Sequence, residues 1–559
     1  MTTTPSRLEA VRVRALARVD RLARRRAARL ARPVSRHFPG ADLVISTTPH
    51  RALSAVRIER RCAVESIELA DSERVLTIRG SHAGTPPTAL TLRGSRVDTI
   101  GAVTVAGPDT FECRIPLHAA GWWGQDRAIP SGAYVLEVVY GRGAPRVLVA
   151  SGALREVLPL HAHGRLANVR VSHAGLGLVT VSMAPPLAPS EVGKAGRASV
   201  TAVKRPTPVA NGTLFAQSWF GKSFSDSPAA LAEALRHDFT EVRVGVHDHS
   251  VEVPDFVTPT IVGSSAWWEA LTSAQVVIDN SWIPSQFKRR PGQRVVQTWH
   301  GTPLKKLGFD RSQHEGRSST PQSFKWGSSK WDLLVSPNSY STEILRRAYT
   351  YDGTIAETGY PRNDVLAAPD GTRDRLRRSL GIGPGEIVVL YAPTFREGEA
   401  DRSTFCDVAA LDRRLGAGHR LLVRGHSATL RSARAIGGPH VIDVTTYPES
   451  AHMLAIADVL ITDYSSVMFD FTATRRPIVF FTPDLDAYAN DGRGVYFDLA
   501  SVAPGPVVHD ERHIADAVRY AWEHRHASSA RYDAWTGRFN AHDDGGATER
   551  LATLVREWL

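Results

Sequence analysis

The sequence contains few cysteines and no long apolar run. Its three cysteines, Cys62, Cys113 and Cys406, are too few and too scattered among 559 residues for a disulfide framework or a zinc site. We expect buried free thiols, with a Cys62–Cys113 pair inside one domain as the alternative. No stretch approaches the roughly 18 to 20 uninterrupted apolar residues that span a bilayer. Arginines interrupt every apolar run in the first forty positions, so no secretory signal is expected.

The net charge of the chain is +11, and most of this excess comes from its start, where acidic residues are scarce. Residues 1–40 hold eleven arginines and two acidic residues, whereas the rest is nearly neutral, so no nucleic-acid groove is expected in the main body. Residues 6–32 lack proline and glycine and repeat apolar residues at helical spacing. We predict that residues 1–40 form a basic amphipathic helical segment that binds an anionic membrane surface. A solvated or self-associating helix is the alternative, and no nucleic-acid partner is predicted.

The next region has the texture of a β domain. Between residues 55 and 183, short alternating runs such as 75–78, 111–115 and 134–139 are separated by Gly, Pro, Ser and Asp. This pattern predicts an antiparallel β-sandwich. Trp122 and Trp123 are candidates for a sugar-stacking face, although core or edge packing is the commoner role of such side chains. Residues 184–211 contain several Pro and Gly and are predicted to be a linker.

From residue 212 onward, apolar strands alternate with helices. This rhythm predicts parallel sheets covered on both faces, and its length indicates two Rossmann-like lobes, 212–380 and 381–559. Ligands of such sheets bind beyond the carboxyl ends of the strands, here facing the cleft between lobes. The predicted strands include residues 242–246, 276–278, 295–297, 333–335, 387–391, 421–423, 459–461 and 478–481.

Two histidines follow predicted strands. His300 comes after the strand 295–297 and stands close to Lys305 and Lys306, which suits proton transfer beside an anion. In the second lobe, His426 follows the strand 421–423 in the same way. A structural histidine that donates to the backbone is the alternative for each of them.

Three further loops contain groups that suit phosphate. Arg362 and Arg396 each occupy a loop after a strand, where a guanidinium can contact phosphate with two parallel hydrogen bonds. Ser465 and Ser466 end a strand and open a predicted helix, where hydroxyls and free amides bind anions. Taken singly, such serines are usually helix caps and such arginines are usually solvated. No Walker-type loop or metal-ligand spacing is present, so no metal and no cofactor is predicted.

Together these motifs resemble those of the bacterial CDP-glycerol glycerophosphotransferases of teichoic acid synthesis. The resemblance spans roughly residues 214–559 and leaves the β domain unexplained. It implies an α/β GT-B fold of two Rossmann-like lobes, here preceded by the basic N-terminal helix and the β-sandwich-like domain. The ordered motifs are Thr298–Lys305, Gly359–Asp364, Tyr391–Arg396 and Ile461–Ser466, with a later run from Asp484 to Asp498 and a looser match from Ser218 to Pro228.

The resemblance also implies roles for the motif residues. His300 is expected to be the base or transition-state group near the acceptor hydroxyl. His426 is expected to stabilise the donor pyrophosphate, although Ser427 follows it where the family usually has proline. Asp463 or Asp470 orients a histidine or binds ribose, with helix capping by Asp463 as the alternative. The predicted donor and phosphate contacts are Arg362, Thr394, Arg396, Asp463, Ser465, Ser466, Asp470 and Arg493, and the acceptor side is predicted to contain Lys305, Lys306 and Asp310.

The implied reaction is attack of an acceptor hydroxyl on the phosphorus that carries glycerol, with CMP leaving. The expected donor is CDP-glycerol, and the expected acceptor is a teichoic-acid-like or capsular polymer or a lipid-linked precursor. The expected location is cytoplasmic, on the inner face of the cell membrane. Three alternatives stay open: transfer from CDP-ribitol, a GT-B glycosyltransferase that uses a nucleotide sugar, and a catalytically silent scaffold that binds polymer through the β domain.

Overall fold

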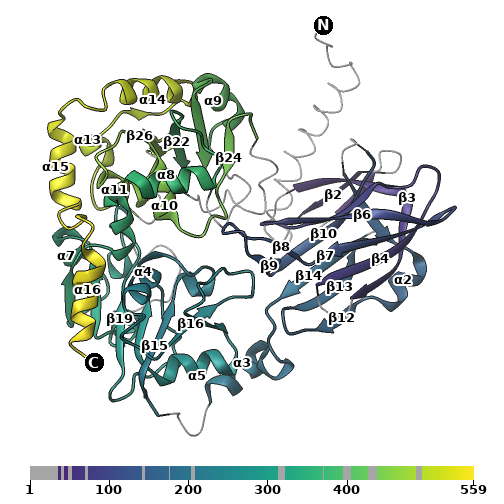
Figure 1. Ribbon diagram of the computed structural model, residues 1–559, viewed down its shortest axis with the longest axis horizontal. Coiled ribbons are helices and arrows are strands. Elements are labelled where there is room, and N and C mark those ends of the chain that lie inside the picture. The colour runs from purple at the N-terminus through teal and green to yellow at the C-terminus, as the bar shows by residue number, and fades with distance from the viewer. Residues whose placement is uncertain are drawn as a thin grey trace. The chain divides into compact units, whose positions relative to one another are not determined.

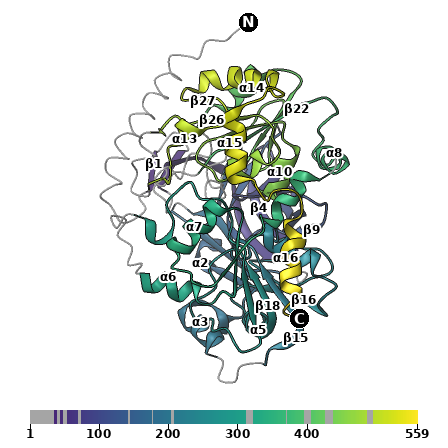
Figure 2. The same ribbon diagram turned by 90° about the vertical axis from the view of Figure 1, so that its left-hand side faces the viewer.

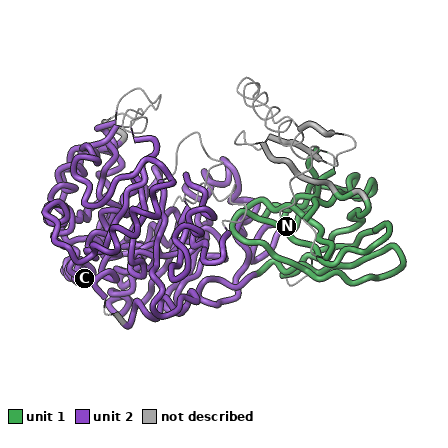
Figure 3. Tube along the Cα trace, turned by 90° about the horizontal axis from the view of Figure 1, so that it is seen from above, with its two compact units in different colours: residues 1–118, 132–162, 169–183 green, residues 119–131, 163–168, 184–559 purple. Residues whose placement is uncertain are grey.

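The structure is a computed structural model, and its described residues form two compact units (Figure 3). Unit 1 comprises residues 1–118, 132–162 and 169–183, and unit 2 comprises residues 119–131, 163–168 and 184–559. The predicted basic helix lies outside the described residues. No helix among the described residues is both long and apolar enough to cross a membrane. The described ranges are 35–38, 43–47, 53–69, 74–141, 145–175, 177–202, 208–311, 321–368, 370–394, 405–425, 437–485 and 494–559.

Unit 1 is built almost entirely from β-strands (Figure 1). The long strand β3 (Leu53–Leu69) pairs antiparallel with β4 (Val75–His82) and parallel with β11 (Arg146–Ala150). Because the strand order β3-β4-β7-β6-β5-β10-β11 begins and ends on paired strands, the sheet curls round and closes on itself. The predicted antiparallel strands are present, but they form one continuous sheet. A register shift in β3 between Val64 and Ser66 marks an irregularity of the kind that bends a strand.

The remaining elements of unit 1 complete and extend this sheet. Cys62 and Cys113 are buried and free, as Cys406 is in unit 2, so the predicted thiol state is observed. Burial raises the pKa of Cys62 to about 12 and that of Cys113 to about 11. The elements are β1 (Ser35–Phe38), β2 (Leu43–Thr47), β5 (Ala89–Arg93), β6 (Asp98–Gly107), β7 (Thr110–Pro116), β10 (Gly132–Val139), α2 (Gly152–Val157), β12 (Leu160–His163), β13 (Asn168–Ala174) and β14 (Leu178–Ala184).

The first lobe of unit 2 contains a seven-stranded parallel sheet in the order β17-β16-β15-β18-β19-β20-β21. Two apolar cores lie against it, one with α4 and the other with α5 and α7. The strands are β15 (Ala210–Gln217), β16 (Glu241–Val246), β17 (Thr258–Ile261), β18 (Ala274–Asp279), β19 (Arg294–Gln297), β20 (Leu333–Ser336) and β21 (Thr354–Glu357). The helices are α3 (Gly193–Thr201), α4 (Asp226–Ala234), α5 (Ser265–Ser273), α6 (Pro321–Ser328) and α7 (Ser339–Ala348).

The second lobe repeats the plan with a six-stranded parallel sheet in the order β24-β23-β22-β25-β26-β27. The strands are β22 (Ile387–Ala392), β23 (His419–Val423), β24 (Val441–Asp443), β25 (Val459–Thr462), β26 (Ile478–Phe481) and β27 (Val507–Val508). The helices are α8 (Asp370–Ser379), α9 (Val408–Leu415), α10 (Ser450–Ile456), α11 (Val467–Thr472), α13 (Leu499–Val502), α14 (Ile514–Glu523) and α15 (Ala530–Phe539). Two such lobes give the GT-B-like fold that the resemblance implied. Two short strands, β8 (His118–Ala120) and β9 (Asp126–Ala128), form a separate two-stranded sheet.

The last helix, α16 (Ala547–Arg556), returns to the first lobe. Its Leu551, Ala552 and Val555 are fully buried in the core that contains α4. Figure 2 shows α15 and α16 following one another toward the C-terminus. Asp364 anchors this crossing, since its carboxylate accepts hydrogen bonds from the first amides of α16. The boundary between lobes is therefore not a single cut in the sequence, because the end of the predicted second lobe completes the core of the first.

Candidate active site

His300 lies in the loop after β19, and its ring is held in one orientation. Its Nδ1 is 2.7 Å from the carbonyl oxygen of Asn280, and its ring stacks on Trp299 with centroids 4.3 Å apart. Because a carbonyl only accepts, Nδ1 carries the proton and Nε2 is the basic nitrogen of the neutral ring. Burial lowers the pKa of His300 and outweighs the opposing effects of the Asn280 hydrogen bond and the Asp226 charge. His300 is therefore neutral at neutral pH and is suited to accept a proton.

Arg362 forms the centre of a buried ion-pair triad. Its Nη1 donates to both carboxylate oxygens of Asp226 at 3.0 and 3.2 Å. Its Nη2 donates to both oxygens of Asp470 at 2.9 and 3.2 Å. Burial acts to lower the pKa of Arg362, but the two carboxylates raise it above the ordinary value, so the guanidinium stays charged.

This geometry bears on the expected role of Arg362, whose contact with phosphate stays a prediction. Both ends of its fork are occupied by carboxylates, so the fork is not open for a bidentate phosphate contact. Asp470 likewise holds Arg362 and the side-chain amide of Asn363, at 3.1 Å, instead of orienting a histidine. Arg362 and Asp470 are thus positioning residues that tie the loop after β21 to the helix α11.

A close approach joins the two lobes beside His300. A β-carbon added to Gly301 would lie 2.9 Å from Ser466 Oγ and 3.9 Å from Arg362 Nη2. The amide of Gly301 also donates to the hydroxyl of buried Tyr360 at 3.2 Å. The structure therefore brings His300, Arg362, Asp470 and Ser466 together, from segments far apart in the sequence.

Asp463 braces two loops of the second lobe. Its carboxylate accepts the amide of Thr394 at 2.9 and 3.0 Å and the amide of Tyr464 at 2.6 Å. It does not cap α11, because the N-cap residue of that helix is Ser466. The Ser466 hydroxyl makes no capping hydrogen bond and lies beside Gly301 instead. Ser465 precedes it and is partly exposed.

The predicted acceptor loop is tied to the second lobe through its backbone. Lys305 forms an antiparallel bridge with Val495, and the amide of Lys306 donates to the carbonyl of Gly494 at 3.1 Å. These main-chain contacts fix the backbone of the loop, which belongs to the first lobe, against the second lobe. The lysine side chains therefore start from an ordered backbone. Their contact with an acceptor stays a prediction.

Asp310 takes part in a local ion pair. Its carboxylate accepts Nε and Nη2 of Arg347 at 2.8–3.1 Å and the hydroxyl of Tyr496 at 2.7 Å. Burial raises the pKa of Asp310, but these hydrogen bonds prevail and lower it. The carboxylate therefore holds the acceptor loop in place, and a direct acceptor contact is not what this geometry favours.

Three predicted site residues, His426, Arg396 and Arg493, lie outside the described residues. Sequence reasoning missed the roles of Asn280, which orients His300, and of Asp226, whose amide donates to Glu449 at 2.6 Å. Asp226 falls in the loosely matched stretch 218–228, which was the only sequence signal for it. Among the described residues, no group of three or more His, Cys, Asp or Glu is placed to hold a metal ion.

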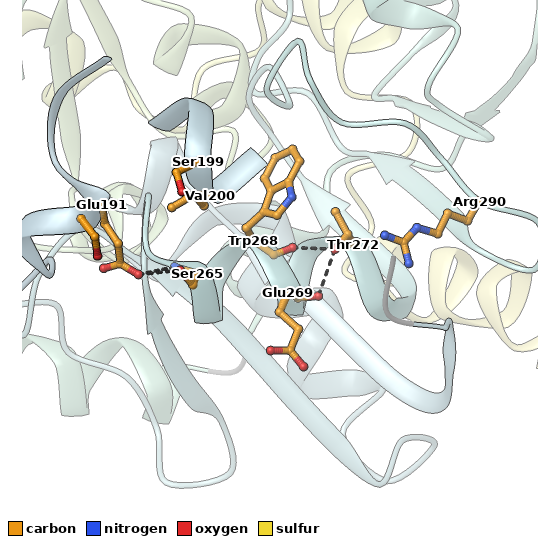
Figure 4. Close-up of a pocket in the computed structure, with 9 residues that line it drawn as sticks. Glu191, Ser199, Val200, Ser265, Trp268, Glu269, Thr272 and Arg290 are labelled. Carbon is orange, nitrogen blue, oxygen red and sulfur yellow. Dashed lines mark hydrogen bonds between the residues drawn. The ribbon is translucent and has the colours of Figure 1, made fainter. Parts of the chain in front are cut away.

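A separate pocket lies between α3 and α5 (Figure 4). None of the predicted site residues that the structure describes lines it. Glu191 accepts hydrogen bonds there from the amide and hydroxyl of Ser265, both at 2.7 Å. The pocket is lined by Ser190, Glu191, Ser199, Val200, Ser265, Trp268, Glu269, Thr272 and Arg290.

Comparison with known families assigns the region that contains the two lobes to a family. Residues 199–557 match the family model of CDP-glycerol:poly(glycerophosphate) glycerophosphotransferases. The chain belongs to this family. The predicted family is thereby confirmed, and with it the predicted enzyme class, a CDP-glycerol glycerophosphotransferase.

Relatives within this glycerophosphotransferase family support the assignment. A teichoic acid glycerol-phosphate transferase of Staphylococcus aureus is 33% identical over 363 residues, which cover 61% of this chain and 92% of that protein. A teichoic acid poly(glycerol phosphate) polymerase of Bacillus subtilis is 31% identical over 62% of this chain, but the match spans only 49% of the polymerase. A solved structure of the wall teichoic acid polymerase TagF superposes with a TM-score of 0.59 at 30% identity, covering 65% of this chain and 93% of that one.

Proposed function

We propose that the protein transfers glycerol phosphate from CDP-glycerol to a hydroxyl of a teichoic-acid-like or capsular polymer and releases CMP. The observation that carries the proposal is the neutral, oriented His300 beside a charged, fully paired arginine in a member of this family. A TagF variant structure was obtained after soaking with CDPG, which supports a CDP-linked donor for this chain as well.

In the proposed reaction, the acceptor hydroxyl gives its proton to Nε2 of His300 as its oxygen attacks the donor phosphorus. A new P–O bond forms to the acceptor, the P–O bond to the CMP phosphate breaks, and CMP leaves with the electron pair. Charge grows on the phosphoryl and leaving oxygens, where positioned donors lower the barrier. We assign these contacts to Ser465, Ser466, Thr394, His426, Arg396 and Arg493.

Arg362, Asp226 and Asp470 serve the reaction indirectly. Their ion pairs hold the loop of residues 359–364 against α4 and α11, and this loop contacts Gly301 through Tyr360. Because a small displacement of a catalytic group costs a large factor in rate, a buried brace at this position supports turnover.

The proposed setting is the cytoplasmic face of the cell membrane. The arginines of residues 1–40 support binding to anionic lipid, each cation near such a surface contributing about 1 kcal/mol. We further propose that residues 55–183 act as an accessory domain to the two transferase lobes and are joined to them through residues 184–211.

Transfer from CDP-ribitol is the second candidate. A teichoic acid ribitol-phosphate primase of Bacillus spizizenii is 25% identical over 299 residues, which is lower than the identity to the glycerol-phosphate transferase. Glycerol is therefore the favoured polyol.

The test is CMP release by the full chain with anionic vesicles and a lipid-linked wall-polymer acceptor, comparing CDP-glycerol with CDP-ribitol. We expect faster, acceptor-dependent release from CDP-glycerol. Faster release from CDP-ribitol would move the chain to the second candidate. Silence with both donors, alongside release of a nucleoside diphosphate from a nucleotide sugar, would overturn the proposal.

A further inference from the structure

A hairpin inserted in the β domain contributes residues to unit 2. The chain leaves unit 1 after His118 and returns at Gly132, and the intervening residues 119–131 belong to unit 2. At its tip, the amide of Gly121 donates to the carbonyl of Gln125 at 2.8 Å, which closes a short turn around Trp122 and Trp123. The transferase chemistry described above gives this hairpin no role.

One side of the hairpin is fixed to the first lobe. Both oxygens of the buried carboxylate of Glu252 accept amides of the turn, from Trp122 at 3.1 Å and from Trp123 at 2.9 Å. A β-carbon on Gly121 would lie 2.2 Å from Glu252 Oε1, so a larger residue there would displace this carboxylate. Glu252 and this turn thus form a fitted contact with charge-assisted hydrogen bonds.

The other side of the hairpin is fixed to the second lobe. The Trp122 indole donates from Nε1 to the hydroxyl of Thr446 at 3.1 Å. Its ring packs edge-on against Tyr447 with centroids 5.2 Å apart. Trp122 therefore contacts both lobes, the first through its amide and the second through its indole.

The loop that Trp122 contacts also holds the start of a predicted donor loop. Nη1 of Arg424 donates to the carbonyls of Val444 and Tyr447 at 3.0 and 2.9 Å. The amide of Gly425 donates to the hydroxyl of Thr445 at 2.9 Å. Gly425 directly precedes His426, the residue that the family resemblance assigns to the donor pyrophosphate.

The same loop reaches the ion-pair triad. Glu449, at its end, accepts the amide of Asp226 at 2.6 Å, and Asp226 holds Arg362. The segment 444–449 therefore touches the hairpin, the Arg424–Gly425 segment and the triad. The conformation of this segment therefore couples the hairpin to the triad and to the start of the predicted donor loop.

We propose that Trp122 is a positioning residue for the donor site, acting through Thr446 and Tyr447 on the loop that holds Arg424 and Gly425. The inference rests on the proposed function, because CDP-glycerol is the ligand whose binding it affects. It also gives the inserted hairpin a part in the transfer reaction: the hairpin fixes the segment 444–449 from outside the two lobes. Trp122 itself touches no reacting atom in this scheme.

The experiment measures the dissociation constant of CDP-glycerol by calorimetry and CMP release by the full-length chain. Trp122→Ala removes the link at the second lobe, and Gly121→Ala disrupts it at the first lobe. Gly132→Ala is the matched glycine control, since a β-carbon there meets nothing within 4 Å. Trp558→Ala is the matched tryptophan control, because this partly buried side chain packs on the core of the first lobe.

Both hairpin variants are expected to raise the dissociation constant of CDP-glycerol at least about fivefold, because misplaced binding groups lose affinity and rate. Trp122→Phe keeps the ring contact with Tyr447 and is expected to recover part of the affinity. If the hairpin had only a structural role, its variants would have a lower melting temperature but an unchanged dissociation constant for CDP-glycerol. That result would overturn the inference. Wild-type protein that neither binds nor turns over CDP-glycerol would overturn the proposed function first, and the inference with it.

Discussion

Replacing Arg362 with methionine should destabilise the protein far more than the loss of an ordinary arginine. The Arg362 side chain is 5% exposed, and those of its partners Asp226 and Asp470 are 3% and 7% exposed. Removing the cation leaves two buried carboxylates facing each other without their shared partner. Breaking a buried pair in this way costs about 3–5 kcal/mol, which is a large part of the roughly 5–15 kcal/mol that stabilises a typical native protein.

The assay is urea unfolding of the wild type and variants at pH 7, followed by tryptophan fluorescence. The free energy of unfolding of Arg362→Lys should lie between those of the wild type and Arg362→Met. The lysine keeps the charge, but its ammonium cannot bridge both carboxylates as the planar guanidinium does.

The matched control is an arginine in an exposed ion pair. Arg512 is 71% exposed and pairs with Asp510 at 2.5 Å, so Arg512→Met should leave the free energy of unfolding unchanged within error. An Arg362→Met variant as stable as this control would refute the reasoning, because it would mean that water or relaxation solvates the two carboxylates.

The remaining predictions concern His300, the proposed base, and its neighbour Gly301. His300→Ala should lower turnover about 10²-fold or more with donor affinity retained; normal turnover would remove it as the base, and His524→Ala, an exposed histidine on the second lobe, is the control. Because the pKa of His300 is lowered and its neutral ring is the active form, wild-type kcat/KM should rise with pH below about 6.5 and level off above it. A continued rise to pH 9 would assign the base elsewhere. Gly301→Ala, whose β-carbon meets Ser466 at 2.9 Å, should lower turnover at least about tenfold in CMP-release assays; unchanged turnover would show that the lobes need not approach so closely.

The strands were predictable from sequence because their signal is local. Each run of apolar β-branched residues after position 212 became a parallel strand, for example Val459–Thr462 in β25. The loops with His300 and Ser466 follow the carboxyl ends of β19 and β25, where ligands of parallel sheets bind, and their part in a site stays a prediction. The closed sheet of unit 1 was not predictable, because the pairing of β3 with β11 depends on contacts between segments almost ninety residues apart, such as Ile58 and Val147.

The sequence by itself determined the alternation of strands and helices, the family motifs and the residue types at the site. Only the tertiary structure decided what those residues do to one another. The local motif around Arg362 predicts a phosphate ligand. In the structure its partners are Asp226 and Asp470, which lie 136 and 108 positions away in the sequence. Hydrophobic period and turn chemistry act over a few residues, whereas the choice of partner for a buried charge is fixed only when the two lobes fold around it.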